Sequence, residues 1–190
     1  MQLLEDRIRS EGIIAPGNVL RVDSFINHQV DIELMSALAQ EFRRLFQDVQ
    51  VDKILTIEAS GIAAACLVAQ EFRVPLVFAK KSKSSNLPAN VYSATTRSYT
   101  HGNVNEVLVS KAYLRPGERV LIIDDFLAHG EALQGLISLV EQAGGSVAGA
   151  GILIEKAFQG GGDRVRARGF RVESLARIAS MSEDGTIVFC

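Results

Sequence analysis

Residues 53–79 follow the order of a β-α-β unit: an apolar segment, a short turn, a helical pattern and a second apolar segment. The first segment is KILTI and its turn is EASG; IAAACLVAQEF then has helical spacing, and PLVFAKK follows as a strand. Such a unit lays its two strands side by side in parallel, and parallel sheets bury both faces under helices. The order recurs at 118–156, where ERVLIIDD, GEALQGLISLVEQAGG and SVAGAGILIEK alternate. We therefore expect an α/β fold with a mostly parallel central sheet flanked by helices.

The segments on either side of these units extend the pattern. QLLEDRIRSE predicts a short amphipathic helix closed by Gly12, and residues 18–25 predict an extended segment. The run 31–48 predicts a helix capped by Asp31, and RVESLARIASMSEDGTIVF predicts strands around a turn. The apolar face of the predicted helix comprises Ile32, Met35, Leu38, Ala39, Phe42 and Phe46. With 190 residues, 47% of them hydrophobic, the chain is long enough for one well-buried domain, which we expect to span 1–190.

Residues 80–103, KKSKSSNLPANVYSATTRSYTHGN, interrupt this rhythm. A long polar stretch inside a compact domain is typical of a functional loop or of disorder. Part of it also fits an exposed hairpin, because VYSATTRSYT alternates and is followed by EVLVSKAYL. We expect a mobile, strand-like excursion here.

Composition excludes several classes of function. A net charge of −2 argues against a general electrostatic role on nucleic acid or on a membrane surface. Cys66 and Cys190 form no disulfide framework, and we expect Cys66 to be a small buried apolar residue. No stretch approaches the length of a membrane span, and MQLLEDRIRSEG does not resemble a signal peptide. These features predict a cytoplasmic protein.

The stretch VLIIDDFLAHGEAL, residues 120–133, carries the first candidate site. Asp124 and Asp125 are expected where a buried strand reaches the carboxyl edge of the sheet, and a small-residue turn and a helix follow. Backbone N–H groups at a helix start bind anions, and small residues allow a phosphate to approach closely. The combination suits a sugar phosphate, although the acids would also fit a simpler role as a cap of the next helix. The stretch is not a P-loop, since no Gly-Lys-Ser/Thr follows the turn.

IEASGI, residues 57–62, is a second candidate anion site. Ser60 and Gly61 open a helix whose amides would face an anion. An ordinary strand-to-helix turn is the alternative interpretation.

The stretch VLIIDDFLAHGEAL resembles the signature of the type I phosphoribosyltransferases, which is a hydrophobic strand, two acids, a small-residue loop and a helix. The resemblance implies that Asp124 and Asp125 meet the ribose hydroxyls of phosphoribosyl pyrophosphate. It also implies a cradle of loop amides for the 5′-phosphate. That cradle comprises Ala128, His129, Gly130, Glu131 and Ala132. The family commonly has Thr where this chain has His129, which affects a side-chain contact to phosphate but not the amides.

Further segments are similar, in order and spacing, to the xanthine phosphoribosyltransferase branch of that family: VDSFINHQVD, TIEASGIA, VPLVFAKKSKS, GILIEKAFQ and RVESLARI. The resemblance implies that one of Lys80 and Lys81 neutralises the pyrophosphate, across the interface of a homodimer. The excursion would be a hood over the reaction, with Ser98 and Tyr99 as its contacts. The turn that binds pyrophosphate would comprise Glu58, Ala59, Ser60 and Gly61.

The same resemblance implies that the nucleobase meets Leu20, Asn27 and Lys156. These residue types suit a purine: Leu20 supplies an apolar wall, Asn27 an amide with donor and acceptor, and Lys156 a cation for a carbonyl oxygen. Phe158 would stack on the ring. Without the resemblance, Asn27 would be interpreted as a turn residue and Phe158 as a core aromatic.

The activity implied is transfer of the phosphoribosyl group to xanthine, giving xanthosine monophosphate and pyrophosphate, with Mg²⁺ bound alongside the donor and no metal site formed by the protein alone. Two alternatives remain open. One is a transferase for guanine or hypoxanthine. The other is a transcriptional regulator that uses the fold to sense phosphoribosyl pyrophosphate. The net charge and the lack of a preceding helix-turn-helix pattern count against the regulator and against any nucleic-acid partner.

Overall fold

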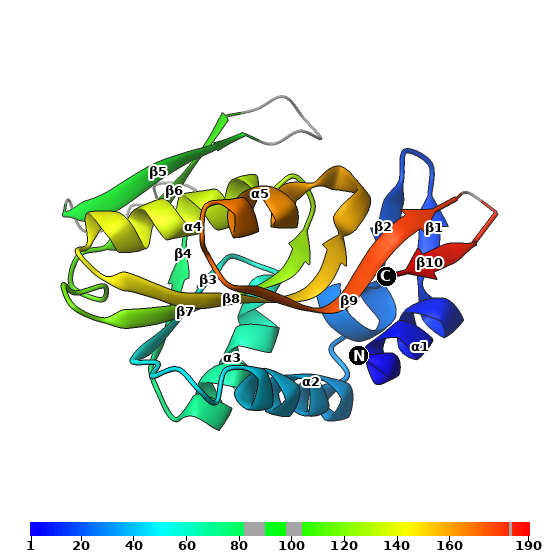
Figure 1. Cartoon of the computed structure of the whole chain (residues 1–190), viewed down its shortest axis with the longest axis horizontal. Helices are drawn as coiled ribbons and strands as arrows, with labels where there is room; N and C mark the ends of the chain where they lie inside the picture. Colours follow the sequence, from blue (N-terminus) through cyan, green and yellow to red (C-terminus); the bar gives the residue numbers. More distant parts are fainter. Residues whose placement is uncertain (82–89, 98–103, 183) are drawn as a thin grey trace.

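A computed structural model describes residues 1–81, 90–97, 104–182 and 184–190, and it contains a six-stranded central sheet (Figure 1). Across the sheet the strands are β10 (Ile187–Phe189), β9 (Val172–Met181), β8 (Ser146–Lys156), β7 (Arg119–Leu127), β3 (Lys53–Ile57) and β4 (Leu76–Ala79). All neighbours pair in parallel except β10 and β9, which are antiparallel. The predicted α/β fold with a mostly parallel sheet is therefore confirmed.

Helices cover both faces of the sheet (Figure 1). Helices α2 (Ile32–Leu45) and α3 (Gly61–Phe72) lie on one face, and α4 (Glu131–Gln142) and α5 (Gly161–Ala167) on the other. Each strand can contact helices on both faces, because successive side chains of a strand point to opposite faces of the sheet. On β7, Leu121 and Ile123 pack with α2 and α3, whereas Val120 and Ile122 pack with α4.

Helix α2 forms as its sequence predicts, with one exception. The Asp31 carboxylate accepts a hydrogen bond from the Leu34 N–H at 3.0 Å, which satisfies one of the free amides of the first turn. The buried face contains five of the six predicted residues, namely Met35, Leu38, Ala39, Phe42 and Phe46. Ile32 is 60% exposed, so that prediction was wrong: Ile32 is the first helical residue and lies beyond the neighbouring core. The prediction for Cys66 was also wrong, because its helix α3 exposes it.

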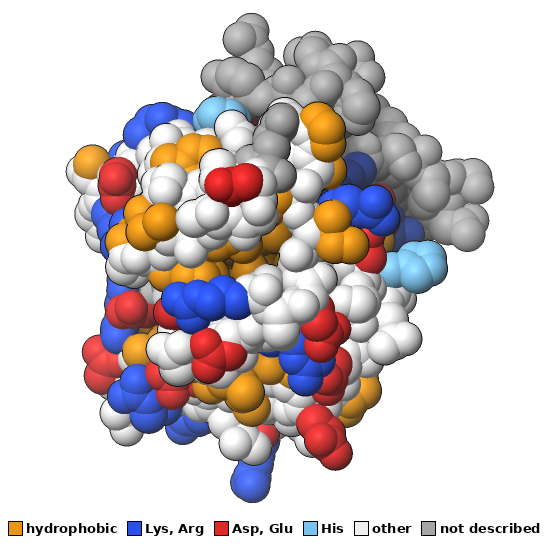
Figure 2. Space-filling model, turned by 90° about the vertical axis from the view of Figure 1, so that its right-hand side faces the viewer, with side chains coloured by type: hydrophobic (Ala, Val, Ile, Leu, Met, Phe, Trp, Pro, Cys, Tyr) orange, Lys and Arg blue, Asp and Glu red, His pale blue; other side chains and the backbone are white. Residues whose placement is uncertain are grey.

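The amino-terminal segments lie beside β9 and β10 at one end of the molecule (Figure 1). Helix α1 (Gln2–Glu11) is followed by a hairpin of β1 (Ile13–Ala15) and β2 (Val19–Arg21). Residues 18–25, predicted as one extended segment, instead end their strand at Arg21 and continue as a single turn of π-helix, η1 (Asp23–Asn27). Figure 2 shows this end of the molecule, where Lys and Arg side chains are interspersed with Asp and Glu.

A second hairpin, β5 (Val91–Arg97) with β6 (Val104–Ser110), packs over α4. The Gln142 side-chain amide of α4 donates to the Ser93 carbonyl at 2.8 Å. The hairpin interpretation of the excursion is thus confirmed for 91–97 and 104–110, but its expected exposure is wrong for β6, where Val107, Leu108 and Val109 are buried. The predicted hood contacts Ser98 and Tyr99 lie outside the described residues. Within the described ranges, no helix is long and apolar enough to cross a membrane.

The chain reverses its direction of winding between β3 and β7. From β3 it passes through α3 to β4 on one side, and from β7 it passes through α4 to β8 on the other. The two central strands also separate: their pairing ends at Leu55 and Ile122, while β7 and β8 remain paired as far as Leu127 and Glu155. In open α/β sheets, ligands bind in the crevice at such a point, outside the carboxyl ends of the strands.

Candidate active site

The two predicted acids lie at this opening between β3 and β7. Asp124 and Asp125 are 4% and 7% exposed, and both belong to β7. The two acids were expected at the end of the strand, and this expectation was wrong by two residues. Strand β7 continues to Leu127 because its pairing with β8 persists past the point where β3 separates. At the acids, β7 is therefore still paired with β8 on one side but no longer paired with β3 on the other.

Burial gives the pair unusual electrostatics. Removal from water, and then the charge of Asp125, raise the pKa of Asp124 well above its ordinary value near 3.8, while the Lys81 ammonium acts in the opposite direction. The Asp125 N–H donates to Asp124 Oδ1 at 3.0 Å. Such a pair is costly to the fold on its own, and hydroxyl groups or a cation placed beside it would lower that cost. Its position favours a ligand that brings hydroxyls.

The turn 58–60 begins directly after β3, and α3 starts at Gly61 on its far side. The peptide bond between Glu58 and Ala59 is cis. A Cβ added at Gly61 would overlap Thr56 Oγ1 and would lie 2.9 Å from Asp124 Oδ1, so only glycine fits this close approach. The first amides of α3 thus open beside the acid pair, as an anion site requires.

The neighbouring lysines have different environments. The Lys81 N–H donates to Glu58 Oε1 at 2.7 Å, which ties the segment after β4 to the 58–60 turn, and the Lys81 charge acts on Asp124. Lys80 forms two 2.9 Å backbone hydrogen bonds with Leu108 and lines a cavity of about 640 Å³ along the edge strand β4. Asp124, Asp125 and the turns 58–60 and 128–130 do not line that cavity. Of the two predicted lysines, the structure brings only Lys81 to the acids.

The turn 128–130 follows β7 and leads into α4 at Glu131, as predicted. Gly130 has φ +82°, a conformation that favours glycine, and it lets the chain enter the helix. The turn is supported from behind by α5: the Gly161 N–H donates to the Ala128 carbonyl at 3.1 Å, and Arg164 donates to the His129 carbonyl at 2.8 Å. The first amides of α4 are therefore held in place at the crevice.

The predicted base-binding residues lie where β8 ends, next to the β1–β2 hairpin. Lys156 is the last residue of β8, and its Nζ donates to the Asn18 carbonyl of the β1–β2 turn at 2.8 Å. Burial lowers the pKa of the Lys156 ammonium, which also lies 5.8 Å from the centre of the Phe126 ring. Leu20 is buried on β2 of the same hairpin. The structure therefore brings the hairpin that carries Leu20 to Lys156.

Asn27 and Phe158 are both exposed. Asn27 ends η1, the π-helical turn that follows β2. Phe158 lies in η2 (Ala157–Gln159), directly after Lys156, and is 41% exposed, so the interpretation as a core aromatic was wrong. Short π-helical turns occur often at functional sites, and an exposed aromatic beside a cation can stack on a ring.

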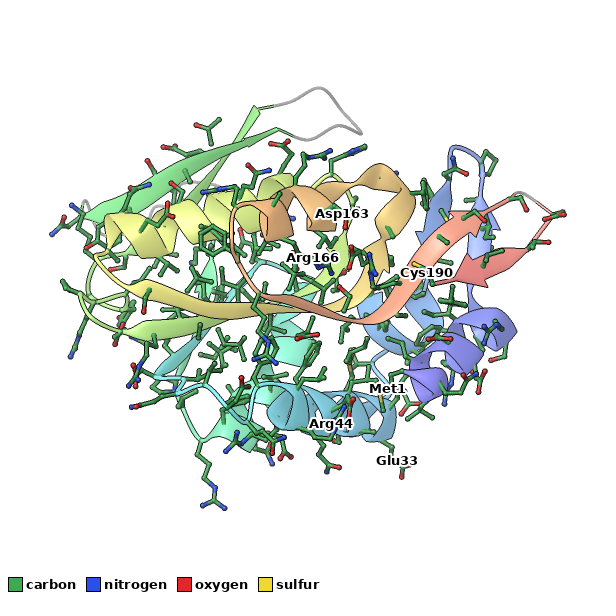
Figure 3. All side chains as sticks on the ribbon, viewed as in Figure 1. Met1, Glu33, Arg44, Asp163, Arg166 and Cys190 are labelled. Carbon is green, nitrogen blue, oxygen red and sulfur yellow. The ribbon has the colours of Figure 1, made fainter. Side chains whose placement is uncertain are left out.

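Behind Lys156 lies a buried acid that the sequence analysis missed. Glu155 is 1% exposed and accepts hydrogen bonds from Arg166 at 2.7 and 2.8 Å, from Arg177 at 3.2 Å and from Ser174 at 2.5 Å. Burial alone would raise the pKa of Glu155, but the bonds from Arg166 and Ser174 outweigh it and hold the pKa below its usual value near 4.5. Figure 3 labels Arg166 on α5. An acid beside a lysine at the end of an apolar strand, ILIEK, was the available signal.

Within the described residues, no cluster of three or more His, Cys, Asp or Glu side chains could hold a metal ion. Mg²⁺ in phosphate sites commonly uses one or two carboxylates together with phosphate oxygens of the substrate. The Asp124–Asp125 pair fits that pattern.

Comparison with known proteins agrees with this geometry. Residues 25–172 match the model of the phosphoribosyl transferase domain. Over the whole chain the protein is 58% identical to the xanthine phosphoribosyltransferase of Lachnoclostridium phytofermentans, covering 98% of that protein, and 53% identical to that of Bacillus cytotoxicus, covering 95%. A crystal structure of adenine phosphoribosyltransferase from Rhodothermus marinus has the same fold, with a TM-score of 0.75 and 24% identity, over 93% of this chain and 98% of that one.

The chain therefore belongs to the phosphoribosyltransferase family, in the group of the xanthine phosphoribosyltransferases. The resemblance seen in the sequence is confirmed. As a member of this family the protein is a pentosyltransferase.

Proposed function

We propose that the protein transfers the 5-phosphoribosyl group from phosphoribosyl pyrophosphate to xanthine, forming xanthosine 5′-monophosphate and pyrophosphate in purine salvage. The observation that carries the proposal is the meeting of three features at one sheet edge. These are a buried acid pair, two turns that each open a helix, and a lysine beside a hairpin. The names of the relatives support xanthine as the base.

On the donor side, Asp124 and Asp125 accept hydrogen bonds from the ribose hydroxyls. The amides of Ala128, His129, Gly130, Glu131 and Ala132 hold the 5′-phosphate. Positive charge develops on the ribose as the bond to pyrophosphate breaks, and the two carboxylates stabilise it. Positioning and charge stabilisation suffice for such a displacement, so no covalent nucleophile is needed.

The turn of Glu58, Ala59, Ser60 and Gly61 receives the pyrophosphate, with Lys81 as the neighbouring cation. The bond between Lys81 and Glu58 supports this role, because it fixes the start of the lysine segment against the turn. Mg²⁺ bound with the donor supplies charge neutralisation of the pyrophosphate, and Asp124 and Asp125 are the residues that would hold it. Lys80 is a secondary candidate for the same role, and only the family resemblance supports it.

On the base side, Lys156 donates to a carbonyl oxygen of xanthine, Leu20 forms an apolar wall, Asn27 pairs with the ring edge and Phe158 stacks on the ring. The lowered pKa of Lys156 reflects a site partly removed from water, where a hydrogen bond to a carbonyl or to an anionic base is stronger. Ser98 and Tyr99 remain predicted contacts of the hood.

Steady-state kinetics with xanthine, guanine and hypoxanthine in parallel test the proposal, with pyrophosphate release as the readout. We expect the highest kcat/KM with xanthine. A higher value with guanine or hypoxanthine would assign the protein to those bases instead. Absence of pyrophosphate release with every base, together with a gel shift on duplex DNA, would favour a sensor of phosphoribosyl pyrophosphate that regulates transcription.

We also propose a homodimer in the cytoplasm. Edge strand β4 supports an interface, because Phe78 is 40% exposed there beside the cavity that Lys80 lines. A cytoplasmic location fits a donor that carries several phosphate charges and does not cross a bilayer unaided. Light scattering after size exclusion should give twice the mass of the 190-residue chain, and Phe78→Asp should give the monomer mass. A wild-type protein of monomer mass would refute the dimer.

A further inference from the structure

Thr56, on β3, carries a hydroxyl that the fold leaves unused. The residue is fully buried, and its Oγ1 has no hydrogen-bond partner in the part of the chain that the structure describes. Buried hydroxyls are normally paired, since an unpaired one forfeits its bonds to water and weakens the fold. Valine has nearly the same shape as threonine, so packing alone does not require a hydroxyl at this strand position. The hydroxyl at Thr56 therefore needs a reason other than stability.

The position of the hydroxyl suggests that reason. Gly61 begins α3, and a Cβ there would overlap Thr56 Oγ1 and lie 2.9 Å from Asp124 Oδ1. The hydroxyl and the carboxylate are therefore neighbours across Gly61, on the two strands that separate at the crevice.

Asp124 needs such a donor. A carboxylate that accepts hydrogen bonds from ribose hydroxyls acts best when ionised, and an ionised carboxylate out of water requires donors around it. Oδ1 accepts a hydrogen bond from the Asp125 N–H at 3.0 Å. The charged groups that act on Asp124 are Asp125, which opposes ionisation, and Lys81, which favours it. The Thr56 hydroxyl is a neutral donor already inside the site.

We propose that Thr56 is a positioning residue for Asp124: in the donor complex its hydroxyl donates to the Asp124 carboxylate and holds it toward the ribose hydroxyls. The inference rests on the proposed function, because Asp124 has this task only if the crevice binds phosphoribosyl pyrophosphate. In this proposal Thr56 acts through Asp124 and not on the substrate directly.

Thr56→Val tests the proposal by removing the hydroxyl and keeping the shape. A hydrogen bond to a charged group is worth enough that we expect the KM for phosphoribosyl pyrophosphate to rise roughly tenfold. The KM for xanthine should stay within about twofold. The Tm of the free variant should be unchanged or higher, because an unpaired buried hydroxyl has been replaced by a methyl group.

Thr56→Ser is the matched control, since it keeps the hydroxyl and removes the methyl group. Its KM for phosphoribosyl pyrophosphate should stay within about twofold of wild type, and its Tm should fall by a few degrees because a small cavity forms. Thr56→Val is thus expected to weaken donor binding without loss of stability, and Thr56→Ser to lower stability without loss of donor binding.

Three results would overturn the inference: an unchanged donor KM in Thr56→Val, an equal defect in Thr56→Ser, or a parallel rise of both KM values. A lowered Tm in Thr56→Val would also overturn it, because the hydroxyl would then support the fold. These outcomes differ from failure of the proposed function, in which the wild-type protein itself releases no pyrophosphate from the donor with any base.

Discussion

The donor side and the base side of the crevice are built differently. The donor side is made of two contiguous strand-turn-helix segments, around 53–61 and 119–132, and its acids are 4% and 7% exposed. The base side is assembled from a hairpin, a π-helical turn and the end of β8, and a hydrogen bond from Lys156 to the Asn18 carbonyl joins the hairpin to β8. The donor side is thus a property of the sheet itself, whereas the base side depends on how distant segments meet.

The difference explains why one side can be interpreted from sequence alone. A strand, a small-residue turn and a helix in succession make a candidate anion site that can be recognised locally, because the free helix amides come with the fold. Leu20, Asn27 and Lys156 are separated by up to 136 positions, and nothing local connects them. The variants below test the contrast, beginning with the largest expected effect.

Asp124→Asn combined with Asp125→Asn should reduce kcat/KM to roughly one-thousandth or less, because the charge that stabilises the ribose is lost. The circular dichroism spectrum should be unchanged. Asp6→Asn, an exposed acid on α1, is the control and should keep wild-type kinetics. Activity within tenfold of wild type in the double variant would remove the acids from the donor site.

Gly161→Ala should raise the KM for phosphoribosyl pyrophosphate by about 10- to 100-fold, because a Cβ there would overlap the Ala128 carbonyl and displace the phosphate turn. The xanthine KM should change much less. Gly169→Ala is a control for stability alone: it has φ +89° and open space around it, so the substitution strains the backbone without touching the turn. Equal effects of the two variants on donor KM would contradict the supporting role of α5.

Lys156→Met should raise the KM for xanthine by roughly tenfold or more and leave the donor KM nearly unchanged, because the variant keeps the stem but removes the charged donor. Lys111→Met, which removes a lysine beside Tyr92 on the distant hairpin, is the matched control. Should the donor KM rise instead, Lys156 belongs to the donor side and the two-sided division fails.

Asp124→Asn should change stability in a pH-dependent manner. Because the folded state raises the pKa of Asp124, the wild-type protein is most stable, in this respect, below the unfolded value near 3.8, and it loses that stability as pH rises through the raised pKa. The Asn variant escapes this loss. Its Tm should exceed the wild-type Tm by about 3 °C or more at neutral pH, and the difference should shrink toward pH 4. A lower Tm for the variant at neutral pH would show that the buried acids do not weaken the fold.

Much of the fold follows from local patterns. The β-α-β units, the cap at Asp31 and the start of α4 were all predicted, because period and turn chemistry are encoded within a few residues. Helix α5 was not predicted, since GGDRVRA is short and begins with two glycines. Ile32 followed the apolar period and is nevertheless exposed, because periodicity does not reveal where the covering core ends.

The site shows the same limit. The two acids lie at the carboxyl side of the sheet as expected. Their polar side chains predicted the end of the strand, but pairing with β8 extends β7 to Leu127. Lys80 and Lys81 are adjacent in sequence, and only the structure distinguishes the cavity that Lys80 lines from the acid pair that Lys81 influences. Thr56 carried no recognisable motif, and the ILIEK pattern around Glu155 did not reveal its role, because both roles depend on burial and on partners from other elements.

The hydrogen bond between Lys156 and the hairpin carbonyl has an evolutionary consequence. Substitutions in a surface turn can alter where that ammonium points without disturbing the sheet that grips the sugar. Descendants of such a scaffold could therefore exchange one nucleobase for another while inheriting the same activated pentose.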